Sequence, residues 1–143
     1  MWKALYVVLI AAAFAYAALP TETTPDRHQT NSPAKVSIRE LLENKELWNS
    51  NRVEVLGYYR CFFEHSVLTA HKGGRPNEGI WVDIFRIAPD GRGRIGRVSN
   101  DFVRVIGVFK VYEGRGAGHL NMCPAEISNL ELLEKTKEPL PTK

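Results

Sequence analysis

The chain has 143 residues, a length typical of one domain. Hydrophobic residues make up 44% and charged residues 24%, a composition that excludes a chain disordered throughout. The formal net charge is only +3, so the overall charge does not by itself indicate a nucleic-acid-binding protein, which needs locally clustered cations.

The N-terminal segment has the pattern of a secretory signal peptide. Lys3 supplies one positive charge, residues 4–19 contain no charged side chain, and a small-x-small sequence ends at Ala17. We therefore expect residues 1–18 to be a signal peptide and the protein to be periplasmic or secreted. The alternative is an uncleaved N-terminal membrane anchor, because the apolar run is close to the shortest length that spans a bilayer.

A flexible linker and a flexible tail flank the predicted domain. Residues 19–35 and 135–143 are rich in polar residues and Pro and poor in large apolar residues. The folded, OB-like domain is therefore expected at residues 36–134.

One helix is predicted at the start of this domain. Ser37 and Glu40 have the spacing of a capping box, and Val36 and Leu41 occupy the positions of a hydrophobic staple. An apolar stripe continues to Trp48, which gives a helix of about three turns.

Five strands follow the helix. Alternating apolar and polar residues place them at residues 52–60, 62–70, 79–87, 102–112 and 121–133. The pattern Val-x-Val-aliphatic-Gly occurs twice, ending at Gly57 and at Gly107. A glycine inside a strand marks a bulge or a bend, which a small closed barrel needs. The predicted fold class is mostly β, a five-stranded barrel preceded by one N-terminal α-helix.

These strands resemble the OB-fold, in the variety seen in anticodon-binding and single-strand-binding domains. The resemblance covers residues 37–134 and rests on Val53-x-Val55-x-Gly57, Ile80-Trp81-Val82-Asp83, Val103-x-Val105-x-Gly107-x-Phe109 and Ile127-x-x-Leu130. The chain is also similar to small exported bacterial proteins of uncharacterised function with an OB-like barrel. The resemblance implies a binding domain for oligonucleotides, oligosaccharides, proteins or small ligands, without choosing among them. The helix usual between the third and fourth OB strands is not expected in this chain.

Aromatic and basic residues on one strand face are the candidate binding site. If Ile80, Val82 and Ile84 face the core, Trp81 and Phe85 point outward and form a stacking platform with an arginine rim. The candidate ligand-binding residues are Trp81, Phe85, Arg86, Arg92, Arg94, Arg104, Arg115 and His119. The alternative is that the aromatics lie under the helix or under residues 86–101, and that the arginines are simply solvated.

The sequence contains two cysteines, Cys61 and Cys123. In an exported protein an even number of cysteines favours pairing, and a bond across this long loop would stabilise the fold by about 4 kcal/mol. The alternative is two separate thiols.

The sequence shows no assembled catalytic group. We find no paired carboxylates, no nucleophile with a base, no phosphate-binding loop and no metal-ligand spacing. The prediction is a non-catalytic exported binding module without cofactor or metal, whose partner is a protein, a glycan or an anionic ligand. The alternative is binding of nucleic acid or another polyanion through the aromatic and arginine face.

Overall fold

The computed structural model describes residues 32–88 and 94–137. The predicted signal peptide, most of the predicted linker, and Arg92 lie outside the described residues. In chain order the elements are β1 (Ala34–Lys35), α1 (Ile38–Glu43), α2 (Lys45–Trp48), β2 (Arg52–Phe62), β3 (His65–Thr69), η1 (Pro76–Glu78), β4 (Ile80–Val82), β5 (Arg94–Ile95), β6 (Asp101–Lys110), η2 (His119–Asn121) and β7 (Glu126–Lys135).

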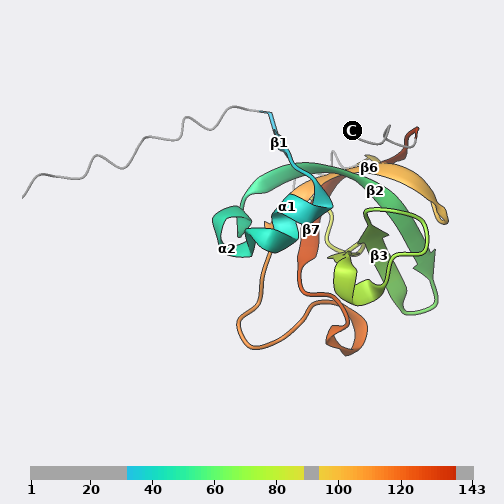
Figure 1. The fold of residues 1–143 in the computed structure, drawn as a ribbon. Coiled ribbons are helices and arrows are strands. Elements are labelled where there is room, and N and C mark those ends of the chain that lie inside the picture. Colours follow the sequence, from blue (N-terminus) through green and yellow to red (C-terminus); the bar gives the residue numbers. More distant parts are fainter. Residues whose placement is uncertain (1–31, 89–93, 138–143) are drawn as a thin grey trace, which may run out of the picture.

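Five of the strands close into a barrel. β2 pairs antiparallel with both β3 and β6, and β3 pairs antiparallel with β4. β4 then pairs parallel with β7, and β7 pairs antiparallel with β6, which completes the ring (Figure 1). The short strands β1 and β5 add parallel to β2 and β7. The predicted fold class, a mostly β five-stranded barrel with a helix near the N-terminus, is confirmed.

The two Val-x-Val-aliphatic-Gly segments pair with each other. Val55 lies opposite Val105, and each glycine lies opposite the first valine of the other segment. The register of β6 against β7 shifts at Gly107, and a Cβ on this residue would lie 2.7 Å from Cγ2 of Ile127. Only glycine allows β6 to approach β7 so closely at the bulge.

The N-terminal helix is capped as predicted but is broken in two. The backbone amide of Glu40 donates to the Ser37 hydroxyl over 3.1 Å, so Ser37 is the N-cap. At Asn44 the backbone leaves helical geometry with φ −121°, which separates α1 from α2. Ile38 and Leu41 are buried in the core, and Figure 1 shows both helices together on one side of the barrel.

The third predicted strand is much shorter than expected. It was predicted at residues 79–87, but β4 ends at Val82. The Phe85 amide donates to Oδ1 of Asp83 over 3.1 Å, a local turn that takes the chain out of the ladder. Ile87 then forms one bridge to β7, and the two-residue strand β5, which was not predicted, pairs with β7 further along.

The main core fills the barrel, and a smaller cluster lies beside it. Val67, Ala117 and Cys123 form this second cluster, with Trp81 and Tyr112 packed against it. The cluster therefore joins β3 and β4 to the long connection between β6 and β7. Within residues 32–88 and 94–137, none of the helices has the length and apolar character needed to cross a membrane.

Candidate functional site

A small hollow forms where β3 and β4 separate. The two strands pair at Val67 and Trp81, but further along the Ser66 hydroxyl bonds to the Val82 carbonyl oxygen over 2.5 Å. The buried Tyr59 hydroxyl lies 2.8 Å from the same serine oxygen. Ser66 and Val82 also line a pocket of about 140 Å³, which we call the aromatic hollow. Its lining residues are Cys61, Phe62, Glu64, His65, Ser66, Trp81, Val82, Ile84 and Phe85.

Large apolar side chains around the aromatic hollow are exposed. Phe85 is 89% exposed and Phe62 54%, although both line it. The Phe62 ring stacks on His65 with centroids 4.5 Å apart. Phe63 (84% exposed) and Leu120 (78% exposed) neighbour Glu64 and His119 in the chain. Phe62 and Phe85 line the aromatic hollow, and Phe63 and Leu120 lie in the loops that meet at Glu64 and His119; we call these four exposed side chains the aromatic patch. Burying them against a partner would release apolar surface from water.

A side-chain contact joins the two loops beside the aromatic hollow. Nε2 of His119 lies 3.2 Å from Oε2 of Glu64, so η2 is tied to the β2–β3 turn. Glu64 itself has φ 55° at this turn. Because Phe63 and Leu120 flank the two members of the pair, the contact brings them to the same edge of the barrel.

Trp81 is half-buried, and its cover comes from the β6–β7 connection. A Cβ on Gly118 would overlap the indole ring, so the backbone of Gly118 lies directly against Trp81. The flanking Ile80 and Val82 are fully buried, as predicted, whereas Ile84, predicted on the same face, lies beyond the end of β4 and is only partly buried. Trp81 therefore faces away from the barrel core yet is not an open stacking platform, whereas Phe85 is exposed.

Carboxylates neutralise two of the predicted arginines. Arg86 lies 3.2 Å from Asp83 and 3.7 Å from Glu126, and these two carboxylates, Asp83 first, raise the pKa of its guanidinium. Arg104 lies 2.7 Å from Glu134, across the β6–β7 ladder. Neither Arg86 nor Arg104 lines the aromatic hollow.

The other predicted site residues are dispersed. The Arg115 guanidinium lies over the Tyr112 ring, 4.7 Å from its centroid, and lines a different pocket. Arg92 lies outside the described residues, and only the backbone of Arg94 is described, in β5. The structure thus brings Trp81 and Phe85 together at the aromatic hollow and places His119 against Glu64, which also lines it. Arg104 and Arg115 lie elsewhere, at Glu134 and in a different pocket.

The two cysteines are free, which corrects the predicted disulfide. Cys61 lines the aromatic hollow, whereas Cys123 packs with Val67 and Ala117 and is 1% exposed. Burial raises the pKa of the Cys123 thiol to about 12. The two thiols occupy separate environments, as in the alternative interpretation. No group of three metal-ligating side chains occurs among the residues that the structure describes.

Comparison of the chain with known protein families, characterised proteins and solved structures finds no match.

Proposed function

We propose that this protein is a non-catalytic, exported binding module that holds an apolar side chain of a partner protein in the aromatic hollow. The observation that carries the proposal is the exposure of Phe62, Phe63, Phe85 and Leu120 around it. An exposed apolar patch with polar residues at its rim is typical of protein–protein contact surfaces. The signal-peptide pattern of residues 1–18 supports export.

The size of the aromatic hollow favours one side chain over a cofactor. Pockets for small molecules and cofactors usually have volumes of about 300–1,000 Å³. The aromatic hollow measures about 140 Å³, and a cavity of about 150 Å³ is enough to hold a benzene-sized group. A Phe, Leu or Met side chain is of this size, and the surrounding exposed rings would then cover it from water.

The position of the aromatic hollow also supports a binding role. We infer that the closed five-stranded mixed barrel is OB-like, with β2, β3, β4, β6 and β7 as its five strands. OB-folds bind ligands on the face of the second and third strands, between the loops that follow the first and fourth strands. In this chain those parts are β3, β4, the turn at residues 63–64 and the connection at residues 111–125. Four of the nine lining residues belong to β3 and β4, and Glu64 belongs to the turn.

Polyanion binding is the competing function, and the charge distribution favours it less. Arg86 and Arg104 already have carboxylate partners, so they offer a phosphate or sulfate group little additional attraction. We expect no retention on heparin or single-stranded DNA at physiological salt. Retention that falls steeply with added salt would favour the polyanion function instead.

A peptide-display selection tests the protein-binding function directly. Random peptides selected on the wild-type chain should carry a large apolar residue, and Phe85→Ser should weaken their binding about tenfold or more, from the lost burial of one aromatic ring. The matched control is Leu47→Ser, since Leu47 on α2 is also exposed (56%) but lies outside the aromatic hollow. Equal binding to both variants, or selected peptides without large apolar residues, would contradict the proposal.

A further inference from the structure

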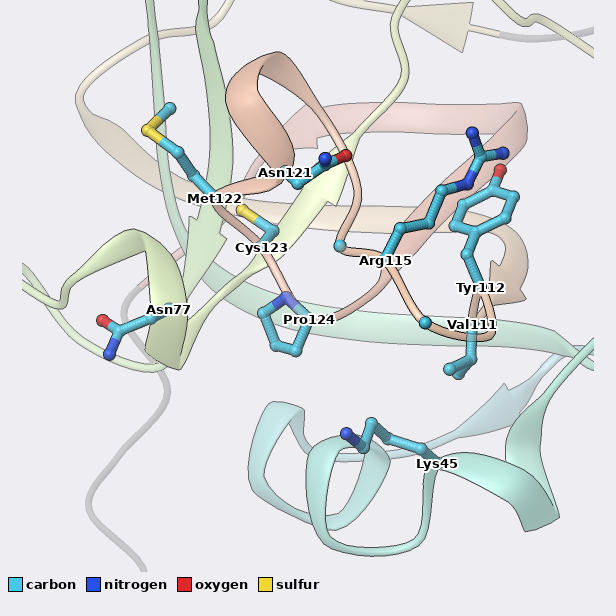
Figure 2. Close-up of a pocket in the computed structure, with 11 residues that line it drawn as sticks. Lys45, Asn77, Val111, Tyr112, Arg115, Asn121, Met122, Cys123 and Pro124 are labelled. Atoms are coloured by element: carbon cyan, nitrogen blue, oxygen red, sulfur yellow. The ribbon is translucent and has the colours of Figure 1, made fainter.

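A second and larger pocket lies between the N-terminal helices and the β6–β7 connection. Its volume is about 350 Å³, and we term it the loop pocket. Lys45 comes from α2 and Asn77 from η1, and the connection supplies the remaining wall (Figure 2). Its lining residues are Lys45, Asn77, Val111, Tyr112, Gly114, Arg115, Gly116, Asn121, Met122, Cys123 and Pro124.

The charge of the loop pocket is positive. Lys45 and Arg115 line it, and none of its lining residues is acidic. Lys45 forms no ion pair with any residue that the structure describes, and Arg115 contacts the Tyr112 ring instead of a carboxylate. This contrasts with Arg86 and Arg104, whose charges are neutralised by neighbours. An anion entering the loop pocket therefore meets cations without a competing carboxylate in its wall.

Backbone contacts hold the wall of the loop pocket in place. Ala117 and Cys123 exchange two backbone hydrogen bonds, of 2.7 and 3.2 Å. A Cβ on Gly116 would overlap the backbone oxygen of Asn121, so the two sides of the connection are closely packed there. The loop pocket is thus built between fixed backbone segments, which lowers the ordering cost of binding.

The helix that carries Lys45 is tied to the same connection. The Val111 amide donates to Oδ1 of Asn49 over 3.0 Å, and the Ser50 amide donates to the Phe109 carbonyl oxygen over 2.8 Å. Both contacts lie just after α2. Figure 2 shows the Lys45 side chain on this helix below Pro124, with Arg115 and Tyr112 to the right. Lys45, Val111 and Pro124 all line the loop pocket, so a cationic side chain and apolar side chains share its wall.

We propose that the loop pocket binds a small organic anion whose carboxylate or phosphate group meets Lys45 and whose apolar body lies against Val111 and Pro124. A charge-assisted hydrogen bond to the ammonium group supplies the recognition of the anionic group. The volume, at the lower end of the range for small-molecule pockets, suits a compact ligand. The site is separate from the aromatic hollow and does not rest on the proposed function.

Three related probes test the chemistry by ¹H–¹⁵N NMR titration of the full chain at fixed ionic strength. Benzoate carries a carboxylate, phenyl phosphate carries a phosphate, and benzyl alcohol is the neutral control. We expect saturable shifts of the amides at residues 111–124 and at Lys45 with at least one anion, and about tenfold weaker binding of benzyl alcohol. The tighter anion identifies the preferred group. Absence of saturable shifts with both anions, or equal binding of benzyl alcohol, would overturn the proposal.

Three lysine variants test the role of Lys45. Lys45→Met should raise the Kd of the tighter anion about tenfold, whereas Lys45→Arg, which keeps the charge, should change it less than about threefold. Lys72→Met removes the same charge from an exposed turn outside the loop pocket and should have no effect. The dispersion of each variant's spectrum checks that it remains folded. Equal weakening by Lys45→Met and Lys72→Met would show a general effect of net charge and would refute the site.

Discussion

Gly118→Ala is expected to destabilise the fold through its contact with Trp81. Gly118 has φ 73° and ψ −166°, a region that is essentially restricted to glycine. A Cβ built there overlaps the indole ring of Trp81. The substitution therefore forces a backbone change, a displacement of Trp81, or both. Gly114→Ala is the matched control, because Gly114 also has a positive φ (66°) but a Cβ there meets nothing within 4 Å.

Gly118→Ala should lower the free energy of unfolding more than Gly114→Ala does, because only its new Cβ overlaps the indole ring. An alanine at Gly114 adds only the left-handed backbone strain, about 1–2 kcal/mol. An alanine at Gly118 adds about 1–3 kcal/mol of backbone strain and about 1–3 kcal/mol for overpacking against a half-buried ring. We therefore expect a loss of about 2–6 kcal/mol for Gly118→Ala, a large fraction of the 5–15 kcal/mol typical of a domain.

Urea denaturation of the two variants and the wild type measures this difference. The loss for Gly118→Ala should exceed that for Gly114→Ala by about 1 kcal/mol or more, at an unchanged m-value. Fluorescence should also show greater solvent exposure of Trp81 in the folded Gly118→Ala protein. Equal losses for the two variants, with unchanged fluorescence, would show that the β6–β7 connection does not pack on Trp81.

The cysteines, helix α1 and one surface ion pair give four further predictions. Alkylation without reductant should label Cys61 in the folded protein and Cys123 only after denaturation, whereas a denatured chain that takes no label would contain the disulfide. Burial raises the pKa of Cys123 from about 9 to about 12. The contribution of this thiol to the free energy of unfolding is therefore constant below pH 9 and falls as the pH rises from 9 towards 12. Urea denaturation of the wild type and of Cys123→Ser over this pH range would measure the fall. Leu41→Ala, at a fully buried site, should cost about 2–5 kcal/mol of unfolding free energy in the same assay. Lys135 pairs with Asp101 and lowers the pKa of its carboxyl group. The pair therefore stabilises the fold fully above the usual carboxyl pKa, and this stabilisation is lost as the pH falls through the lowered pKa. Lys135→Met should raise the Asp101 pKa in an NMR titration, and an unchanged pKa would exclude the pair.

The strands in which apolar and polar residues alternate strictly could be predicted from the sequence. Val53 and Val55 on β2, and Val103 and Val105 on β6, are all fully buried. Apolar residues at every second position indicate a strand with one buried face, and this pattern can be recognised from residues that are close in the sequence. Which strands pair with one another is a property of the closed barrel, and the direct pairing of the two glycine-containing segments appears only in the structure.

The aromatic patch was partly missed because its hairpin lacks a recognisable turn signal. β2 and β3 are joined by two residues, Phe63 and Glu64. Such short turns usually contain Gly, Asn or Asp, and this one has Glu64 at φ 55° instead. The only available signal was the run Cys61-Phe62-Phe63, since successive strand residues cannot all face the core. This run predicts that at least one phenylalanine is exposed, but it does not predict that the exposed ring lies near Phe85, which is distant in the sequence.

The carboxylate partners of Arg86 and Arg104 were missed for a different reason. The sequence shows how many arginines the chain has, but which carboxylates they pair with depends on the register of strands that are distant in the sequence. Arg104 meets Glu134, thirty residues further along, only because β6 and β7 pair antiparallel. The contact between Arg86 and Asp83 is local, at a separation of three residues, and could have been considered from the sequence. The two ion pairs support the proposed protein partner over a polyanion, which the sequence had left as the alternative.

Gly118 separates the two proposed sites, and this makes their tests independent. Trp81 lines the aromatic hollow, while the connection that covers it at Gly118 also supplies Asn121 and Cys123 to the loop pocket. Phe85→Ser changes only the first site and should leave benzoate or phenyl phosphate binding unaltered. Lys45→Met changes only the second and should leave peptide binding unaltered. Gly118→Ala displaces the shared wall, so it should weaken both kinds of binding, and a loss confined to one would show that the connection does not form a wall of the other.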